Sequence, residues 1–590
     1  MGIAGSKVRA SQAMTAVHQA AWSAVLRLGV ARPLGPRNRR EQLAVITAAV
    51  AVGSSFEPGL LPRSTRDQVL VTSASALTAL SVVTMGASVA RLAGNVAARV
   101  ARRRDPLDAA TVTEPLAQGS TAVFPTAVAL VTKQLADITR RATSYAEAQT
   151  MPESPRQSVL VAAGVGVCTV GVQALERTAA GAVGRRLHAR FPGYDVEANV
   201  VGHAAPLVVA AGVLATGYVW AARQAEHAAT VTEPAYATLP ESPYVTGGPG
   251  SAVPFATLAR EGRRFTSKVL NRDEIEQVMG EPAKADPIRA FVGLPTAPSM
   301  AERVAILMAE LERMGAFERD LLVLVSPTGS GYINYVAAEA VEYLTLGSSA
   351  IFGVGYSVLP SLMSMRQTDL AVSQNRAVLD AVTTRLRGIA AERRPRLVTY
   401  GESLGANTLQ DVWCGVGVAG LRRDGVSAAL FLGTPAAGRF AREWRAEPQR
   451  MDPQGQLIEV DNFAEYLARC TTHPGTGRYV LLTHLDDPVA KFERQLLVRR
   501  PDWLGPPTSR PAGVSTSARW WPGTTFMVTA SDVVNATSLT PGHFSRRAHD
   551  YREDIARFVS AVYQLPATDA QMAAVEKALR TKEKYWAART

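Results

Sequence analysis

The stretch Gly401-Glu402-Ser403-Leu404-Gly405 decides the fold predicted for this chain. It follows a short apolar run, 396–400, that suits a buried strand, and it precedes 406–413, which can continue as a helix. A serine between a strand and a helix, with glycine two residues away on either side, is typical of a nucleophile elbow. The tight turn needs small neighbours, and it leaves the serine Oγ projecting above the sheet. We therefore predict Ser403 as a nucleophile, with an ordinary strand-to-helix turn as the alternative.

Strand and helix patterns alternate on both sides of this stretch from about residue 288 onward. Short apolar runs of strand length alternate with longer runs whose apolar spacing is near that of a helix. The alternation predicts βαβ units, and therefore a doubly wound, mainly parallel α/β sheet with helices on both faces. Besides the elbow strand, the predicted strands are 288–293, 321–325, 350–355, 428–432, 479–483 and 525–529, and the predicted helices include 300–314, 336–344, 369–391 and 552–563.

A serine nucleophile needs a histidine base and a carboxylate that orients the base. In α/β-hydrolases these groups follow one another in the order serine, acid, histidine. Asp486 and Asp487 end a predicted strand at a proline, so we predict Asp487 as the acid and keep Asp486 as its alternative. Beyond this pair, His543 lies in a Pro-Gly loop before the closing helix and is the predicted base. His549 is the second choice, and His484 is expected to form structural hydrogen bonds under the acid loop.

The oxyanion that forms during acyl transfer needs two backbone N–H donors. The N–H of Leu404, the residue after the predicted nucleophile, supplies one. The second is predicted from Thr328 or Gly329, in a glycine-rich loop that follows an apolar strand and enters a helix. This loop lacks the lysine of a phosphate-binding loop, and the G-x-G-x-x-G pattern is absent, so no nucleotide site is predicted. We expect no cofactor and assign no metal ligands.

The chain is apolar for its length, since hydrophobic residues make up 47% and charged residues 19% of 590. The apolar excess is concentrated in N-terminal runs that predict an all-α transmembrane domain before the sheet. By the positive-inside rule, nearby arginines favour cytoplasmic termini and a cytoplasmic catalytic domain in a multi-pass protein of the plasma membrane. Buried helices of a soluble domain are the alternative. The predicted spans are 43–61, 69–90, 159–174 and 200–222, and a shorter run at 122–131 would reverse the orientation if it crossed.

These patterns divide the chain into a membrane domain of about four transmembrane helices at 1–222, a linker at 223–287, a catalytic α/β-hydrolase domain at 288–567 and a charged helical tail at 568–590. The formal charge of +12 is compatible with nucleic acid or an anionic surface. However, the arginines cluster beside apolar runs and no nucleic-acid-binding motif is present, so no nucleic-acid partner is expected. Three cysteines cannot form a disulfide framework.

With these motifs in this order, the chain resembles a family of integral-membrane α/β-hydrolases found in actinobacteria. The resemblance implies an N-terminal multi-span region, a C-terminal catalytic domain and serine-hydrolase chemistry. The sequence departs from the family after Asp-Pro-Val, at Ala490-Lys-Phe492, and after Gly433-Thr-Pro435, where substrate preference would differ. The matching segments are Glu57-Pro-Gly-Leu-Leu-Pro-Arg63, Val245-Thr-Gly-Gly-Pro-Gly-Ser251, Gly262-Arg-Arg-Phe265, Pro327-Thr-Gly-Ser-Gly331, Tyr356-Ser-Val-Leu-Pro-Ser361, Gly401-Glu402-Ser403-Leu404-Gly405, Asp487-Pro-Val489, Leu496-Leu-Val-Arg-Arg-Pro-Asp-Trp-Leu504 and Gly542-His543.

Together these features predict a membrane-bound serine hydrolase, esterase-like or lipase-like, that forms an acyl-enzyme on Ser403. A lipid or another hydrophobic ester is the expected substrate, and membrane lipids are expected partners. The same triad with a lipid or glycolipid acceptor would make an acyltransferase. A non-catalytic membrane scaffold or lipid transporter is the alternative of another class, although the intact order of serine, acid and histidine argues against it. The sequence does not predict the oligomeric state.

Overall fold

The computed structural model describes residues 50–79, 181–190, 231–536 and 540–589, and in addition 47, 133, 178, 223–224 and 227–229. The chain divides into two compact units. The second unit contains the strands and the predicted site. The first comprises Met1–Pro58, Pro62–Leu214 and Trp521–Val528, and the second comprises Gly59–Leu61, Ala215–Trp520 and Thr529–Thr590.

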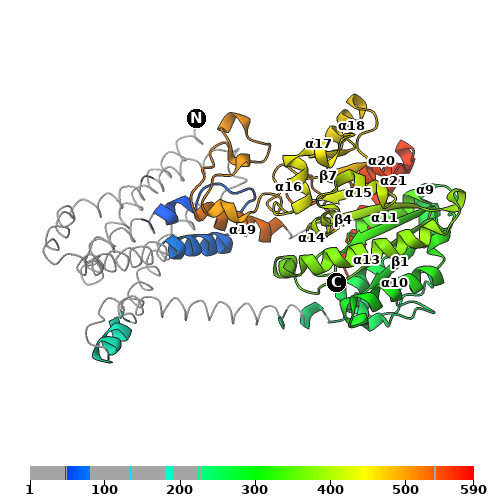
Figure 1. The fold of residues 1–590 in the computed structure, drawn as a ribbon, viewed down its shortest axis with the longest axis horizontal. Helices are drawn as coiled ribbons and strands as arrows, with labels where there is room; N and C mark the ends of the chain where they lie inside the picture. The colour runs from blue at the N-terminus through cyan, green and yellow to red at the C-terminus, as the bar shows by residue number, and fades with distance from the viewer. Residues whose placement is uncertain are drawn as a thin grey trace, which may run out of the picture. The chain divides into compact units, whose positions relative to one another are not determined.

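A seven-stranded sheet forms the centre of the second unit (Figure 1). Its strand order is β1-β3-β2-β4-β5-β7-β6. Every neighbouring pair is parallel, so the carboxyl ends of all seven strands lie at one edge. The chain changes direction across the sheet between β3 and β4, which makes the loops after β2 and β4 neighbours of the switch point. The strands are β1 Ile288–Val292, β2 Leu321–Ser326, β3 Ser349–Val354, β4 Arg396–Glu402, β5 Val426–Leu432, β6 Leu457–Val460 and β7 Tyr479–Leu482.

Helices pack on this sheet in two groups, as the alternation in the sequence predicted. In one group α13 contacts both α10 and α14, and in the other α11 contacts α9, α20 and α21. The helices are α8 Ala259–Ser267, α9 Arg272–Met279, α10 Met300–Arg313, α11 Tyr335–Leu344, α12 Ser361–Ser364, α13 Thr368–Arg387, α14 Leu404–Gln410, α15 Gly417–Arg423, α16 Arg439–Ala446, α17 Pro448–Met451, α18 Phe463–Thr472, α19 Thr524–Ala536, α20 Ile555–Val562 and α21 Asp569–Ala587.

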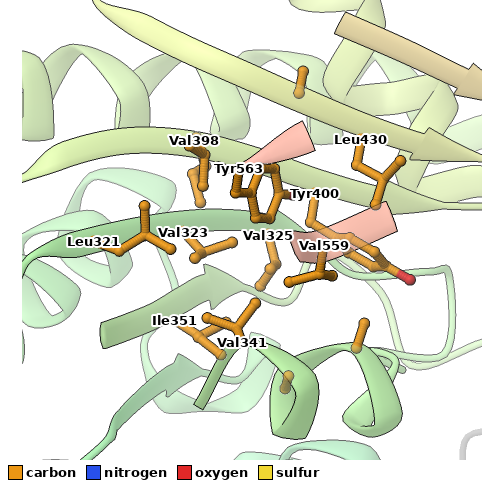
Figure 2. Packing of buried hydrophobic residues seen from close by; sticks show 14 of the residues in the cluster. Leu321, Val323, Val325, Val341, Ile351, Val398, Tyr400, Leu430, Val559 and Tyr563 are labelled. Carbon is orange, nitrogen blue, oxygen red and sulfur yellow. The ribbon is translucent and has the colours of Figure 1, made fainter. Parts of the chain in front are cut away.

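Alternate residues of the central strands build the core beneath α11 and α20. Figure 2 shows Val323 of β2 and Tyr400 of β4 on the same face of the sheet as Val341 of α11 and Val559 of α20. All four are less than 5% exposed, and they belong to one continuous cluster. Full burial of each such aliphatic side chain contributes roughly 1.5–3 kcal/mol, so this packing fixes the strand ends that carry the site.

A buried ion pair joins the outer strand β1 to α11. Arg289 and Glu342 are both fully buried, and Arg289 donates to the Glu342 carboxylate through Nε at 2.5 Å and Nη2 at 2.9 Å. Arg289 Nη1 also donates to the carbonyl of Phe265, in α8. Residues of the predicted linker 223–287 therefore pack on the catalytic sheet, since Thr246 N–H donates to the Arg289 carbonyl as well.

The prediction of a multi-pass membrane protein is wrong. No helix within the described residues is long and apolar enough to cross a membrane. The run 43–61 fails for a local reason: its helix ends at a turn beginning at Ser55, and the following chain is non-helical up to residue 64. A fully buried arginine, Arg63, donates to the Ser55 carbonyl there, at 2.9 Å. The predicted runs at 122–131, 159–174 and 200–222, and 69–90 beyond residue 79, lie outside the described residues.

Two strand predictions are wrong. The run 525–529 was predicted as the last strand but lies within helix α19, and the short strand β6 was not predicted. The first error arises because an apolar run of five residues does not distinguish a strand from a buried helix segment. Within the described residues, the helix α19 and not a strand is therefore the element before the loop that contains His543.

Candidate active site

The elbow at the end of β4 has the backbone that its sequence predicts. Ser403 has φ 56° and ψ −126°, a strained conformation for a residue with a side chain. A Cβ on Gly401 would lie 2.7 Å from Ala406 Cα, and a Cβ on Gly405 would lie 2.2 Å from the Ser326 carbonyl oxygen. Both positions therefore need glycine. The Ser403 N–H donates to the Leu432 carbonyl at 2.8 Å, which fixes the turn against the end of β5.

The predicted oxyanion loop lies beside this turn. Because the Ser326 and Pro327 carbonyls touch Gly405, the loop after β2 is packed directly on the elbow. The N–H of Thr328 donates to the Tyr332 carbonyl at 2.9 Å, so it is already used within the loop. Gly329 is held against Ser364, since its Cβ would lie 2.4 Å from Ser364 Oγ. Of the two predicted loop donors, Gly329 N–H is therefore the better candidate to act with Leu404 N–H.

The predicted acid Asp487 lies in the loop after β7 and is fully buried. Its Oδ1 accepts the Val489 N–H at 2.8 Å, and its Oδ2 accepts the Tyr551 hydroxyl at 2.6 Å. The same Oδ2 lies 2.8 Å from Nδ1 of His549. Two donors, the Val489 N–H and the Tyr551 hydroxyl, thus orient the carboxylate toward the imidazole.

The structure pairs the second-choice base, His549, with the acid, and not His543. The His549 ring lies against Gly433, where a Cβ would be only 2.5 Å from its Cε1. Gly433 follows Leu432, whose carbonyl accepts the Ser403 N–H, so the imidazole lies at the strand end that holds the nucleophile turn. Its Nε2 is buried and has no hydrogen-bond partner within the described part of the chain.

His543 lies elsewhere for a structural reason. Its loop follows α19 and packs on α21, where the Gly542 N–H donates to Glu583. The His543 side chain is exposed, and its carbonyl accepts Arg552 Nη2 at 3.1 Å. A turn between this loop and α20, rather than the loop itself, brings the base to Asp487.

Asp486, the alternative acid, fixes that turn instead of the base. Its Oδ1 accepts the Ala548 N–H at 2.8 Å, and its Oδ2 accepts Arg547 Nε at 2.9 Å. His484 Nδ1 lies 3.0 Å from the Ala548 carbonyl, which confirms the structural role expected for it. Ala548 has a φ of 57° and is bound on both sides immediately before His549. The two neighbouring carboxylates thus have different roles: Asp486 holds the turn before His549, and Asp487 contacts the His549 imidazole.

Two family models match the chain. A model described as the α/β-hydrolase family matches residues 288–575, and a model described as the N-terminus of an α/β-hydrolase family matches residues 56–269. The chain belongs to an α/β-hydrolase family. The matches confirm the predicted α/β-hydrolase family and a hydrolase-type function. They do not support the predicted actinobacterial origin or the predicted multi-span membrane region. No curated protein and no solved structure matches the chain.

Electrostatics in this α/β-hydrolase favour a charged carboxylate beside the imidazole. Burial raises the pKa of Asp487, but the charge of His549 and the hydrogen bonds from His549, Tyr551 and Val489 outweigh burial and lower the pKa below its ordinary value. For His549, burial lowers the pKa. The charge and the hydrogen bond of Asp487 raise the pKa by more than burial lowers it, so the pKa of His549 lies above its ordinary value. Asp487 therefore holds the Nδ1 proton and stabilises the imidazolium.

Sequence reasoning missed Tyr551, the second donor to Asp487. Its ring stacks on His484, with centroids 4.3 Å apart, and meets the His549 ring edge-on at 5.6 Å. The signal was present two residues after His549, where the sequence His549-Asp-Tyr551 puts a second hydrogen-bonding side chain close to the base in the chain. Within the described residues, no group of three or more His, Cys, Asp or Glu side chains could hold a metal ion.

Proposed function

We propose that this α/β-hydrolase is a serine hydrolase that cleaves carboxylic esters through an acyl-enzyme on Ser403. The observation that carries the proposal is the buried Asp487–His549 pair, with Nε2 left unpartnered at the strand end that fixes the Ser403 turn. Hydrogen bonds between a nucleophile and its base are often completed only when substrate is bound.

The chemistry follows from these positions. His549 Nε2 takes the proton of Ser403 Oγ as the oxygen attacks the ester carbonyl, and the N–H groups of Leu404 and Gly329 bind the oxyanion. The imidazolium then gives its proton to the leaving alcohol, and the acyl group stays on Ser403. Water, deprotonated by His549, attacks the acyl-enzyme and releases the acid, with the proton returning to Ser403 Oγ.

A hydrophobic ester is the substrate class that the surroundings favour. Leu404, beside the nucleophile, packs with Tyr356 and Ala371 in a buried apolar cluster. An apolar wall next to the nucleophile favours an apolar acyl group over a charged one, because burial of an unpaired charge there would be unfavourable. If an alcohol replaced water in the second step, the same acyl-enzyme would make an acyltransferase.

A fluorophosphonate probe tests the nucleophile directly. We expect the wild-type chain to be labelled and the Ser403→Ala variant to remain unlabelled. Ser373→Ala is the matched control, since Ser373 is exposed on α13 and bonds only to the Asp369 carbonyl among the described residues. Equal labelling of wild type and Ser403→Ala would refute the assignment. Product analysis with p-nitrophenyl esters, with and without an added alcohol, then separates hydrolysis from acyl transfer.

The labelling rate has an expected pH dependence. The base must be neutral to accept a proton, and its pKa is raised above the ordinary value of about 6.5. Labelling should therefore increase with pH through a midpoint above about 6.5.

A further inference from the structure

A buried carboxylate that this mechanism does not use lies directly before the nucleophile. Glu402, the last residue of β4, is 8% exposed. Its Oε2 accepts the side-chain N–H of Asn334 at 2.7 Å and the hydroxyl of Tyr400 at 2.8 Å. Within the described chain it forms no ion pair with an arginine or lysine. Because its side-chain donors are neutral, no cation in the described part of the protein offsets the charge of the ionised carboxylate, which can therefore act on a cation that forms nearby.

The orientation of Glu402 is fixed through a helix cap. Asn334 Oδ1 accepts the N–H groups of Val336 at 3.0 Å and Ala337 at 3.2 Å, at the start of α11. Because the amide oxygen caps the helix, the amide nitrogen must face Glu402. Asn334 also follows the loop in which Thr328 bonds to Tyr332. One residue thus connects the oxyanion loop, α11 and the carboxylate.

Glu402 and His549 lie at the same end of two neighbouring strands. Glu402 pairs with Leu432 in the register of β4 and β5. The next residue, Gly433, lies against the His549 imidazole. The residue that carries the carboxylate and the residue that contacts the base therefore lie at the ends of two paired strands, where charges in a buried site can interact.

We propose that Glu402 is a positioning residue that acts through His549: its carboxylate stabilises the imidazolium that forms when the base takes the Ser403 proton. This role rests on the proposed serine-hydrolase function. It gives the imidazolium two negative neighbours, Asp487 in direct contact and Glu402 at longer range. The residue between glycine and serine in the elbow then has a function of its own.

The charges around His549 agree with this arrangement. After burial and Asp487, the negative charge of Glu402 is the next influence that raises the His549 pKa, followed by Asp550. Burial, and then the charge of Glu402, also raise the pKa values of Tyr332 and Tyr400, which therefore remain neutral. The titratable and charged groups of the surrounding elements are Asp487, Glu402, Asp550, Tyr332, Tyr400, Tyr551, His484, Lys491 and Arg552.

The test is the pH profile of fluorophosphonate labelling in the full chain with Glu402→Gln. Glutamine keeps the shape and still accepts from Asn334 and Tyr400, so the fold is preserved. Loss of the negative charge should move the acidic limb to lower pH by roughly half a unit, and it should lower the plateau rate about threefold. Glu310→Gln is the matched control, because Glu310 is 1% exposed but lies in α10, where it binds Arg313 and Ser251.

The outcomes separate the two proposals. A wild-type chain that is not labelled would refute the proposed function itself. A labelled wild type whose acidic limb is unchanged by Glu402→Gln, or is moved equally by Glu310→Gln, would overturn the role of Glu402 alone. Melting temperatures of both variants identify any loss of fold, and a shifted limb at an unchanged melting temperature supports the proposal.

Discussion

The nucleophile turn at 401–405 and the base turn at 543–549 differ in how their geometry is encoded. The elbow is specified locally, since its glycines meet Ala406 and Ser326, and its strand and helix are its immediate neighbours in the chain. The base turn is specified at long range, because His549 is 62 residues from its partner Asp487. A short pattern therefore predicts the first region, whereas the second depends on which loop the fold brings to the sheet.

The largest expected effect comes from replacing each of the two candidate histidines by alanine. His549→Ala should reduce the rate of ester hydrolysis by about a thousandfold or more, because it removes the group that accepts the Ser403 proton. His543→Ala should leave the rate near that of wild type, since His543 is exposed and its neighbour Gly542 is bonded to Glu583 of α21. Steady-state kinetics on one short-chain ester measures both. A large loss in His543→Ala with activity retained in His549→Ala would restore the sequence-based choice.

The local character of the elbow is tested by its second glycine. Gly405→Ala would place a Cβ 2.2 Å from the Ser326 carbonyl oxygen and 3.0 Å from that of Pro327, and both are backbone atoms that cannot move aside. We expect about a hundredfold slower labelling of Ser403 and a destabilisation of about 3 kcal/mol.

Gly388→Ala is the control for this substitution, because Gly388 has an αR backbone and its Cβ would meet only Arg385 O at 3.4 Å. Urea unfolding and labelling rates, measured on both variants, give the two quantities. Normal labelling in Gly405→Ala would mean that the turn tolerates bulk and that the pattern G-x-S-x-G overstates its constraint.

The fold was predictable where the signal was periodic or local. Six of the seven strands carry apolar runs that can be recognised, but β6, Leu457–Val460, is a short strand at the edge of the sheet whose apolar run is interrupted by Glu459. The run 525–529 shows the opposite failure, since its β-branched residues are compatible with a strand while the helix α19 accommodates them. Apolar runs near the N-terminus predicted membrane spans, yet in the described part of that region a buried arginine, Arg63, and a turn at Ser55 interrupt the pattern.

The same distinction applies to the site. The pattern at 401–405 includes the residues whose contacts impose the strained turn, so Ser403 could be chosen from five letters. The choice between His543 and His549 could not be made in this way, because both lie in polar turns before α20. What decides it is the pair of bonds from Asp486 to Arg547 and Ala548, which turn the chain so that His549 faces Asp487. Those contacts depend on the packing of β7 against the C-terminal segment.

Among the substitutions that compare the two turns, the smallest effect is expected for Tyr551, which binds the acid that orients the base. Tyr551→Phe removes the 2.6 Å hydrogen bond to Asp487 Oδ2, the oxygen that also binds His549. A carboxylate with one donor fewer interacts more strongly with the imidazolium, so the pKa of His549 should rise and the acidic limb of labelling should move to higher pH. The rate at neutral pH should fall about tenfold or less, in keeping with one hydrogen bond to a charged group.

This shift is opposite in sign to that expected for Glu402→Gln, and the opposition is informative. Loss of fold in either variant would lower the rate without moving the limb in opposite directions. If Tyr551→Phe moved the limb to lower pH, the hydroxyl would be supporting the imidazolium directly rather than sharing the carboxylate. Paired pH profiles of the two variants therefore distinguish two effects on His549. One is the effect of the Tyr551 hydroxyl on Asp487, and the other is the effect of the Glu402 charge at the end of β4.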